Sequence, residues 1–213
     1  MSIQVREYRN PNNSNLPLRV AKGHFATSHS HINYYVDLTM TKHRLSEARK
    51  AASELASQFK ASTIVDTILC LDGTEVIGAC MASQLTAAGI TNMNAHQTIY
   101  VVTPEHTVGS QLLFRDNIAP MIVNKHVLIL AASVTTGYTA LAGVEAVNYY
   151  GGTPVGICAI FAGVESCAGF PVVSIFNTNI FGDYESRPAH ECPMCKAGQR
   201  VEALVNTYGI SSF

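Results

Sequence analysis

The sequence predicts a single α/β domain built on a central, mainly parallel sheet. Short apolar segments of strand length alternate along the chain with segments of helical periodicity, which is the pattern of βαβ units. Hydrophobic residues make up 47% of the 213 residues and charged residues only 14%, so the chain can bury a large core. Because no internal repeat or low-complexity tract is visible, one domain with small terminal additions accounts for this length.

The first part of the chain predicts one helix followed by a strand and a second helix. Residues 1–33 lack a clean period, so we expect an irregular segment there. Apolar residues then recur at helical spacing between charged ones, which predicts an amphipathic helix at 45–59. The next elements are a buried strand at 64–71, a turn at 72–74 and a helix at 75–85.

The second part continues the alternation. Residues 103–117 have no clean period and predict a long, mobile loop. A helix at 139–149 ends at a pair of glycines with a proline beyond. Strands are predicted at 98–102, 126–132, 155–161 and 172–176. In such a sheet, ligands bind beyond the carboxyl ends of the strands.

Composition excludes several classes of protein. A formal charge of −1 with 14 Lys+Arg gives no concentrated basic surface for nucleic acid. No apolar run reaches the roughly 18 residues of a membrane span, and the polar start MSIQVREYRN lacks a signal-peptide core. We therefore expect a cytoplasmic protein with no nucleic-acid or membrane partner, in which an even cysteine count is poor evidence for disulfides.

The turn after the strand at 126–132 has the composition of an anion-binding site. Small hydroxyl residues and a glycine connect this strand to the next helix, where free backbone N–H groups carry the positive end of the helix dipole. The hydroxyls can add donors, and Gly137 allows close approach of the backbone. Threonines at this position could instead cap the helix, so both interpretations are open. The candidate phosphate-binding residues are Ser133, Thr135, Thr136, Gly137, Tyr138 and Thr139.

The stretch VLILAASVTTGYT resembles the signature of the type I phosphoribosyltransferases, in which two acids, two further residues and Thr-Thr-Gly-x-Thr follow an apolar strand. The resemblance covers about residues 20–180 and is closest to the orotate phosphoribosyltransferases. Residues 23–37 resemble their N-terminal hood, 71–79 their pyrophosphate loop and 103–117 their flexible loop. It implies a hood at 1–40, an α/β core at 41–182 and a C-terminal extension at 183–213.

The resemblance also implies a chemistry. The phosphate loop would hold the 5-phosphate of phosphoribosyl pyrophosphate (PRPP), and Mg²⁺ would bridge ribose and pyrophosphate. A nucleobase nitrogen would then displace pyrophosphate, with catalysis by positioning, charge stabilisation and loop closure. The resemblance implies a homodimer. The residues that would face the pyrophosphate are Asp72, Gly73, Thr74 and Glu75.

The turn at 72–75 has two further interpretations. Its acids could hold Mg²⁺ through water, or they could cap the helix that follows. The backbone N–H groups of Gly73 and Thr74 are better pyrophosphate donors than the acids, which repel an anion unless a metal intervenes.

The sequence departs from the family pattern at the acidic pair. Ala131 and Ala132 occupy those positions, and a methyl group cannot accept a hydrogen bond from ribose. Each lost charge-assisted hydrogen bond is worth roughly 1.5–3 kcal/mol. Tyr138 stands where the family often has glycine, and it would be strained if the backbone there needed a positive φ.

The predicted loop at 103–117 also lacks the lysine that orotate enzymes place on it. Arg115 is its cation, apart from His106 if protonated. Arg115 could clamp a pyrophosphate as a catalytic residue, or it could pair with Asp116 or with another carboxylate.

Two groups of metal-ligating residues lie near the chain ends. Cys192 and Cys195 form a C-x-x-C pair that is half of a zinc site, and Cys167 or a subunit partner could complete it. We expect structural thiols here rather than bound zinc. His24, His29 and His31 would be ligands only if the backbone brought them together, and we expect separate hood histidines.

Two functions follow from these observations. The first is a phosphoribosyltransferase that uses PRPP, with Mg²⁺, and a nucleobase such as orotate. The second is a non-catalytic nucleotide- or phosphate-binding sensor that has lost the ribose-binding acidic pair.

Overall fold

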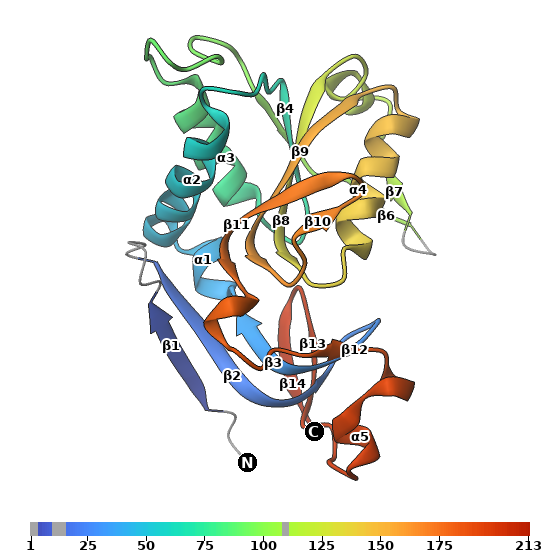
Figure 1. The fold of residues 1–213 in the computed structure, drawn as a ribbon. Helices are drawn as coiled ribbons and strands as arrows, with labels where there is room; N and C mark the ends of the chain where they lie inside the picture. The colour runs from blue at the N-terminus through green and yellow to red at the C-terminus, as the bar shows by residue number, and fades with distance from the viewer. Residues whose placement is uncertain (1–3, 10–15, 108–110) are drawn as a thin grey trace.

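A core sheet and a hood sheet follow one another along the long axis of the molecule (Figure 1). The structure is a computed structural model that describes residues 4–9, 16–107 and 111–213. The core sheet lies at the top of Figure 1, and the hood sheet below it contains strands from both ends of the chain.

The core sheet has the order β10-β11-β9-β8-β4-β5. All neighbours pair in parallel except β10, which is antiparallel to β11. The predicted α/β fold with a mainly parallel sheet is therefore confirmed. The strands are β4 (Thr67–Cys70), β5 (Tyr100–Val102), β8 (His126–Val134), β9 (Thr153–Ala162), β10 (Ser166–Cys167) and β11 (Phe170–Asn177).

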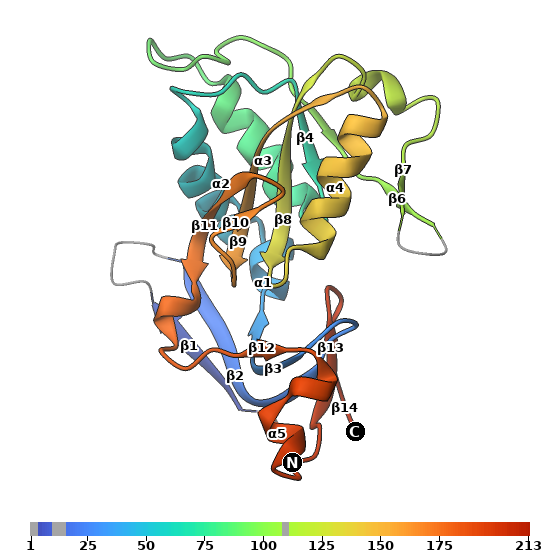
Figure 2. The same cartoon turned by 45° about the vertical axis from the view of Figure 1, so that its right-hand side comes forward.

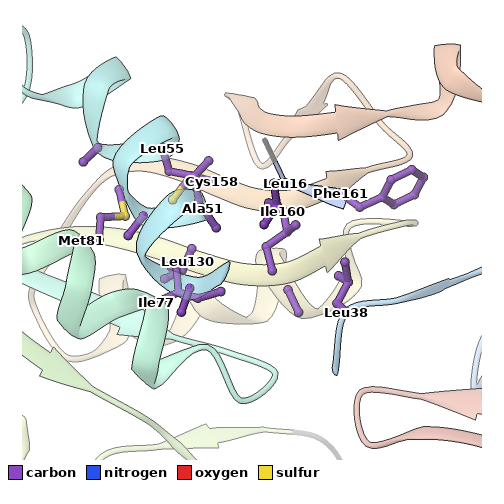
Figure 3. Close-up of a cluster of buried hydrophobic side chains, with 14 of the residues drawn as sticks. Leu16, Leu38, Ala51, Leu55, Ile77, Met81, Leu130, Cys158, Ile160 and Phe161 are labelled. Carbon is purple, nitrogen blue, oxygen red and sulfur yellow. The ribbon is translucent and has the colours of Figure 1, made fainter. Parts of the chain in front are cut away.

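Helices cover both faces of this sheet (Figure 2). Helices α2 (Leu45–Phe59) and α3 (Glu75–Thr86) pack on one face, and α4 (Tyr138–Tyr149) packs on the other. Alternate residues of β8 supply the two cores: Leu130 lies in the cluster with α2 and α3, and Ile129 in the cluster with α4. Figure 3 shows the first cluster, in which Leu55 and Met81 converge on the strands.

The hood sheet has the order β12-β3-β2-β13-β14, with β1 paired to β2. The expectation of an irregular segment at 1–33 was wrong for its described residues. Antiparallel β2 and β3 form a long hairpin, but a bulge between Lys22 and Phe25 interrupts its alternation, and two of its partners, β12 and β13, lie far along the sequence. The strands are β1 (Val5–Arg9), β2 (Pro17–Ala26), β3 (His31–Asp37), β12 (Ser186–Arg187), β13 (Ala203–Asn206) and β14 (Gly209–Ser212).

The expected loop at 103–117 contains a hairpin. Strands β6 (Glu105–His106) and β7 (Leu112–Leu113) pair antiparallel, and residues 108–110 lie outside the described residues. The predicted boundary at residue 40 falls inside α1 (Thr39–His43), and that at 182 follows η2 (Thr178–Ile180). The remaining short helices are η1 (Ala119–Met121), η3 (Ala189–Glu191) and α5 (Pro193–Lys196). Across the described ranges, no helix is both long and apolar enough to cross a membrane.

A largely buried ion pair joins the hood to the core. The guanidinium of Arg19 in β2 donates to both carboxylate oxygens of Glu47 in α2, at 2.8 and 3.1 Å. The hydrogen bond from Arg19 lowers the pKa of Glu47 against the opposing effect of burial. Arg19 also contacts Glu7 at 3.2 Å, but Glu7 has an exposed side chain. The Glu47 contact therefore fixes the hood relative to α2.

We predict that Glu47→Gln lowers the free energy of unfolding by about 3 kcal/mol, because it leaves the Arg19 guanidinium partly buried without its charged partner. The matched control Glu7→Gln should cost less than about 1 kcal/mol, because that pair is exposed. Urea denaturation measures both changes.

The same pair predicts a pH dependence. Because the pKa of Glu47 is lowered in the folded state, its stabilisation is complete above the unfolded-state pKa of about 4.3 and is lost as pH falls through the lower folded-state value. The difference in stability between the native protein and Glu47→Gln should shrink over that range. A difference that is constant from pH 7 to pH 3 would contradict the ion-pair interpretation.

Candidate ligand-binding site

A cavity of about 190 Å³ lies between the carboxyl ends of the core strands and the hood. The turn between β8 and α4 forms its floor, and Asp72 enters from the turn after β4. The hood contributes the β2–β3 turn at residues 27–30, part of β3, and residues 205–207 of the C-terminal segment. Both ends of the chain therefore complete a site that begins at the core sheet.

The turn between β8 and α4 presents open hydrogen-bond donors to this cavity. Strand β8 continues two residues beyond the predicted end, so Ser133 lies in the strand, and α4 begins at Tyr138. Within the described residues, no acceptor takes a hydrogen bond from the backbone N–H groups of residues 136–139. The hydroxyls of Thr135, Thr136 and Thr139 likewise make no hydrogen bond to a described residue. The threonines therefore do not cap α4, and the capping interpretation is wrong.

Gly137 sets the shape of this turn. It is the N-cap of α4 and has a φ of 89°, a left-handed conformation that favours glycine. A Cβ at this position would lie 3.1 Å from Sγ of Cys167, which itself hydrogen-bonds to the Gly137 carbonyl at 3.3 Å. Tyr138 is the first helical residue and does not have a positive φ, so a side chain there causes no backbone strain. Its ring lies 5.1 Å from that of His29 in the hood.

Asp72 brings a carboxylate to the place where the family pattern has its acidic pair. Ala131 and Ala132 are both buried, on opposite faces of β8. Asp72, from the turn after the neighbouring strand β4, accepts a hydrogen bond from the Ala132 N–H and lines the cavity. Burial raises the pKa of Asp72, and the nearby Lys42 ammonium opposes that shift.

The other predicted residues of this turn have different positions. The Thr74 hydroxyl is buried and lies 2.8 Å from the Leu71 carbonyl oxygen and 3.1 Å from that of Leu130, so it ties β4 to β8 rather than facing a ligand. Glu75 is exposed on the first turn of α3 and is outside the cavity lining. Gly73 has a φ of 76° and lies close to the Lys42 ammonium.

Lys42 lies beside the site, in a neighbouring cavity of about 60 Å³ that Ser133 and Thr207 also line, and the sequence did not indicate it. Its buried ammonium donates to the backbone oxygens of Asp72, at 2.9 Å, and Thr207, at 2.6 Å. Burial lowers its pKa. An ammonium has three donors, so one remains beyond these two contacts. A single lysine in a polar stretch is ordinarily exposed, and only the tertiary contact with Thr207 reveals its position.

Arg115 lies outside the cavity lining. Its guanidinium makes two 2.7 Å hydrogen bonds to the Glu105 carboxylate, next to the β6–β7 hairpin. The alternative prediction, pairing with a carboxylate other than Asp116, is thus the arrangement in the structure. A role in clamping pyrophosphate would require this pair to break.

The structure brings the C-x-x-C pair together with two histidines. Ligand atoms of His24, His31, Cys192 and Cys195 all lie within 4.8 Å of one another. The expectation of separate hood histidines was therefore wrong for His24 and His31. Cys167 lies instead at Gly137, so it does not complete the pair. A short histidine pair and a C-x-x-C were visible in the sequence, but their pairing across the chain was not.

The solved structures to which this chain is similar include several phosphoribosyltransferases. Orotate phosphoribosyltransferase of Mycobacterium tuberculosis, in complex with Fe(III) dicitrate, matches 78% of this chain and 93% of its own at 19% identity and a TM-score of 0.53. UMP synthase of Leishmania donovani matches 75% of this chain and 34% of its own, at 16% identity and a TM-score of 0.55. Adenine phosphoribosyltransferase of Trypanosoma brucei, solved with AMP, pyrophosphate and ribose-5-phosphate, matches 76% and 78%, at 14% identity and a TM-score of 0.52.

These likenesses show that the chain has the type I phosphoribosyltransferase fold. No family model and no curated protein matches the sequence. The fold class is therefore recognisable from the three-dimensional arrangement and from the local signature at the β8–α4 turn.

We predict that Gly137→Ala destabilises the protein by more than the roughly 1–2 kcal/mol cost of a left-handed alanine, because its Cβ also crowds Cys167. Gly151→Ala is the matched control, since Gly151 has a φ of 74° and open space around it. Urea denaturation compares the two variants, and Cys167→Ala in the Gly137→Ala background should recover the difference. Equal costs for the two glycines would contradict the contact.

Proposed function

We propose that this protein binds a 5-phosphoribosyl compound in the cavity between core and hood. The observation that carries this proposal is the open N-terminus of α4, where free N–H groups and three hydroxyls face the cavity. A phosphate supplies the acceptors that these donors lack, and its charge is favoured at the positive end of the helix dipole.

The charged groups near the loop suit the rest of such a ligand. Asp72 can accept hydrogen bonds from ribose hydroxyls, and Lys42, in the adjoining cavity, has a donor left for a pyrophosphate that extends past Ser133. A carboxylate of this kind, with substrate phosphates, is also the donor set that Mg²⁺ takes. Mg²⁺ bound there would neutralise charge on the leaving pyrophosphate.

The hood side of the cavity suits a neutral nucleobase. Tyr34, Tyr35, Phe161 and Tyr184 line it, and aromatic rings can stack on a base. Among the described residues that line the cavity, none is a lysine or arginine. The carboxylate of an anionic base such as orotate would have no cationic partner there, so we favour a neutral base.

The activity that this site supports is phosphoribosyl transfer. In that reaction a base nitrogen forms a bond to the anomeric carbon of PRPP while the bond to pyrophosphate breaks, and pyrophosphate leaves. The loop at residues 133–139 would hold the 5-phosphate, Asp72 the sugar and Lys42 the leaving group. Catalysis would then rest on orientation and on charge stabilisation within the cavity.

A second function is favoured by specific observations. Ala131 and Ala132 leave Asp72 as the one carboxylate among the described residues that line the cavity, and Arg115 is paired with Glu105. A site of this kind could bind a nucleotide or sugar phosphate without turnover, as a sensor. The homodimer that the sequence resemblance implies remains a prediction under both functions.

Turnover separates the two functions. If the protein is a transferase, incubation with PRPP, Mg²⁺ and a panel of bases should release pyrophosphate, with neutral bases preferred over orotate. If it is a sensor, nucleoside monophosphates and ribose-5-phosphate should bind in calorimetry without turnover. The Gly137→Ala variant is the control, and it should lose binding in both cases. Absence of binding by any phosphoribosyl compound would contradict the proposal.

We predict that Asp72→Asn weakens PRPP binding in Mg²⁺ by about tenfold or more, because a charge-assisted hydrogen bond is worth roughly 1.5–3 kcal/mol. Inorganic phosphate, which contacts only the loop, should bind the variant unchanged. Glu145→Gln, on the exposed surface of α4, is the matched control. Calorimetry measures each affinity.

The same variant should not destabilise the protein at pH 7. Burial raises the pKa of Asp72, so its ionised form costs stability above that pKa, and the cost disappears below the unfolded-state value. An amide removes this cost while its oxygen can still accept from the Ala132 N–H. Loss of both phosphate binding and stability would indicate that Asp72 is only structural.

A further inference from the structure

We propose that His24, His31, Cys192 and Cys195 bind one zinc ion, which ties the C-terminal segment of the hood to the β2–β3 hairpin. None of the four ligands lines the cavity, but the turn at residues 27–30, between the two histidines, does. The metal site does not depend on the proposed function, although its consequence for the cavity does.

Four of the six distances between the ligand atoms are close to those of a tetrahedral zinc site. His24 Nε2 lies 3.0 Å from His31 Nδ1, 3.5 Å from Cys192 Sγ and 3.7 Å from Cys195 Sγ. Cys195 Sγ lies 3.2 Å from His31 Nδ1. Zinc–sulfur bonds of about 2.3 Å and zinc–nitrogen bonds of about 2.0–2.1 Å require edges of roughly 3.3–3.8 Å. The remaining two pairs, Cys192 Sγ–Cys195 Sγ and Cys192 Sγ–His31 Nδ1, lie within 4.8 Å, so shifts of up to about 1 Å would admit the ion.

The donor set and its surroundings favour zinc. Two thiolates and two imidazoles are soft and borderline ligands that suit Zn²⁺ rather than Mg²⁺ or Ca²⁺. The Nδ1 of His24 lies 3.0 Å from the Gln199 carbonyl oxygen, to which it can donate, so that its Nε2 lone pair is free for a metal. All four ligands are protein atoms, and His24 and Cys192 are buried, which is the closed arrangement of a structural site.

Several local features hold the ligands in place. His24 lies in the bulge of β2, where its N–H donates to the Glu202 carboxylate at 3.0 Å. A Cβ at Gly23 would lie 2.8 Å from Cζ of the buried Phe25 ring and from that carboxylate, so the packing beside the ligand favours glycine. Cys192 is the N-cap of α5 and Cys195 lies within its single turn, which aims both thiols to one side. Neither cysteine is in a disulfide.

The site joins parts of the chain that are distant in sequence. Cys192 is 168 residues from His24, and Cys195 is 164 residues from His31. In Figure 1, α5 lies at the lower edge of the hood, next to the end of β12. A metal here therefore cross-links the two segments that build the hood.

This cross-link would also set the hood side of the cavity. His24 and His31 flank the turn at residues 27–30, which lines the cavity and carries His29 against Tyr138 of the phosphate loop. Fixing both ends of that turn, together with the segment that continues to Thr207, holds the hood over the loop. We therefore expect removal of zinc to weaken closure of the cavity rather than the phosphate loop itself.

Metal analysis of the purified full chain tests the site directly. Elemental analysis should find about one zinc per chain, and Co²⁺ exchange should give the visible spectrum of a tetrahedral ion with thiolate charge transfer. Cys195→Ser and His31→Asn should lose most of the metal. The matched control Cys80→Ser, in α3 and distant from the cluster, should keep it.

The outcomes are distinct. A protein that stays metal-free after reconstitution with zinc, or that forms a Cys192–Cys195 disulfide in a reducing purification, would overturn the proposal. Equal zinc content in Cys195→Ser and Cys80→Ser would also overturn it. Zinc content is measured without a phosphoribosyl ligand. A failure of the zinc proposal can therefore be told apart from a failure of the proposed function. If a ligand variant does not fold, the zinc content and the Co²⁺ spectrum of the native protein still decide the question.

Discussion

The free donors at the start of α4 are the feature on which the functional interpretation depends. A helix that begins without a side-chain cap leaves its first N–H groups to water or to a ligand. Gly137 makes this arrangement possible, because its left-handed backbone turns the chain from β8 into α4 at a point where a Cβ would crowd Cys167. The cavity then surrounds these donors with the ends of the core strands and with the hood.

Long-range contacts place the hood over that turn. The Arg19–Glu47 pair connects β2 to α2, and Lys42 links the carbonyl after β4 to Thr207 near the C-terminus. The cluster of His24 and Cys192, with their two partners, joins the same two chain ends on the far side of the hood. Each contact joins segments that are distant in sequence. The cavity therefore forms only when these segments pack together.

The core could be predicted from the sequence because its signals are local. The periodicity at 45–59 and the apolar run before Ser133 are set by neighbours a few residues apart, and the helix and strand bounds agree closely with the structure. The hood could not be predicted this way. The bulge at Lys22 to Phe25 breaks the alternation of β2, and β13 pairs with β2 from the other end of the chain. In the site, the spacing of hydroxyl residues and glycine identified the loop at 133–139. The direction of the Asp72 carboxylate and the burial of Lys42 could not be predicted, because both depend on tertiary packing.

The balance of charge in the cavity sets what the site can do. The family signature has two acids on one strand, whereas here the carboxylate of Asp72 reaches the same backbone from the turn after the neighbouring strand β4. Its hydrogen bond from the Ala132 N–H stabilises the ionised form, but burial acts in the opposite direction and has the larger effect. A cationic ligand group or a metal that approaches Asp72 therefore lowers its pKa and favours the ionised carboxylate, because either would offset the cost of burial. A ligand that brings both a phosphate and such a partner would satisfy the α4 amides and the carboxylate together, and neither group alone would do so.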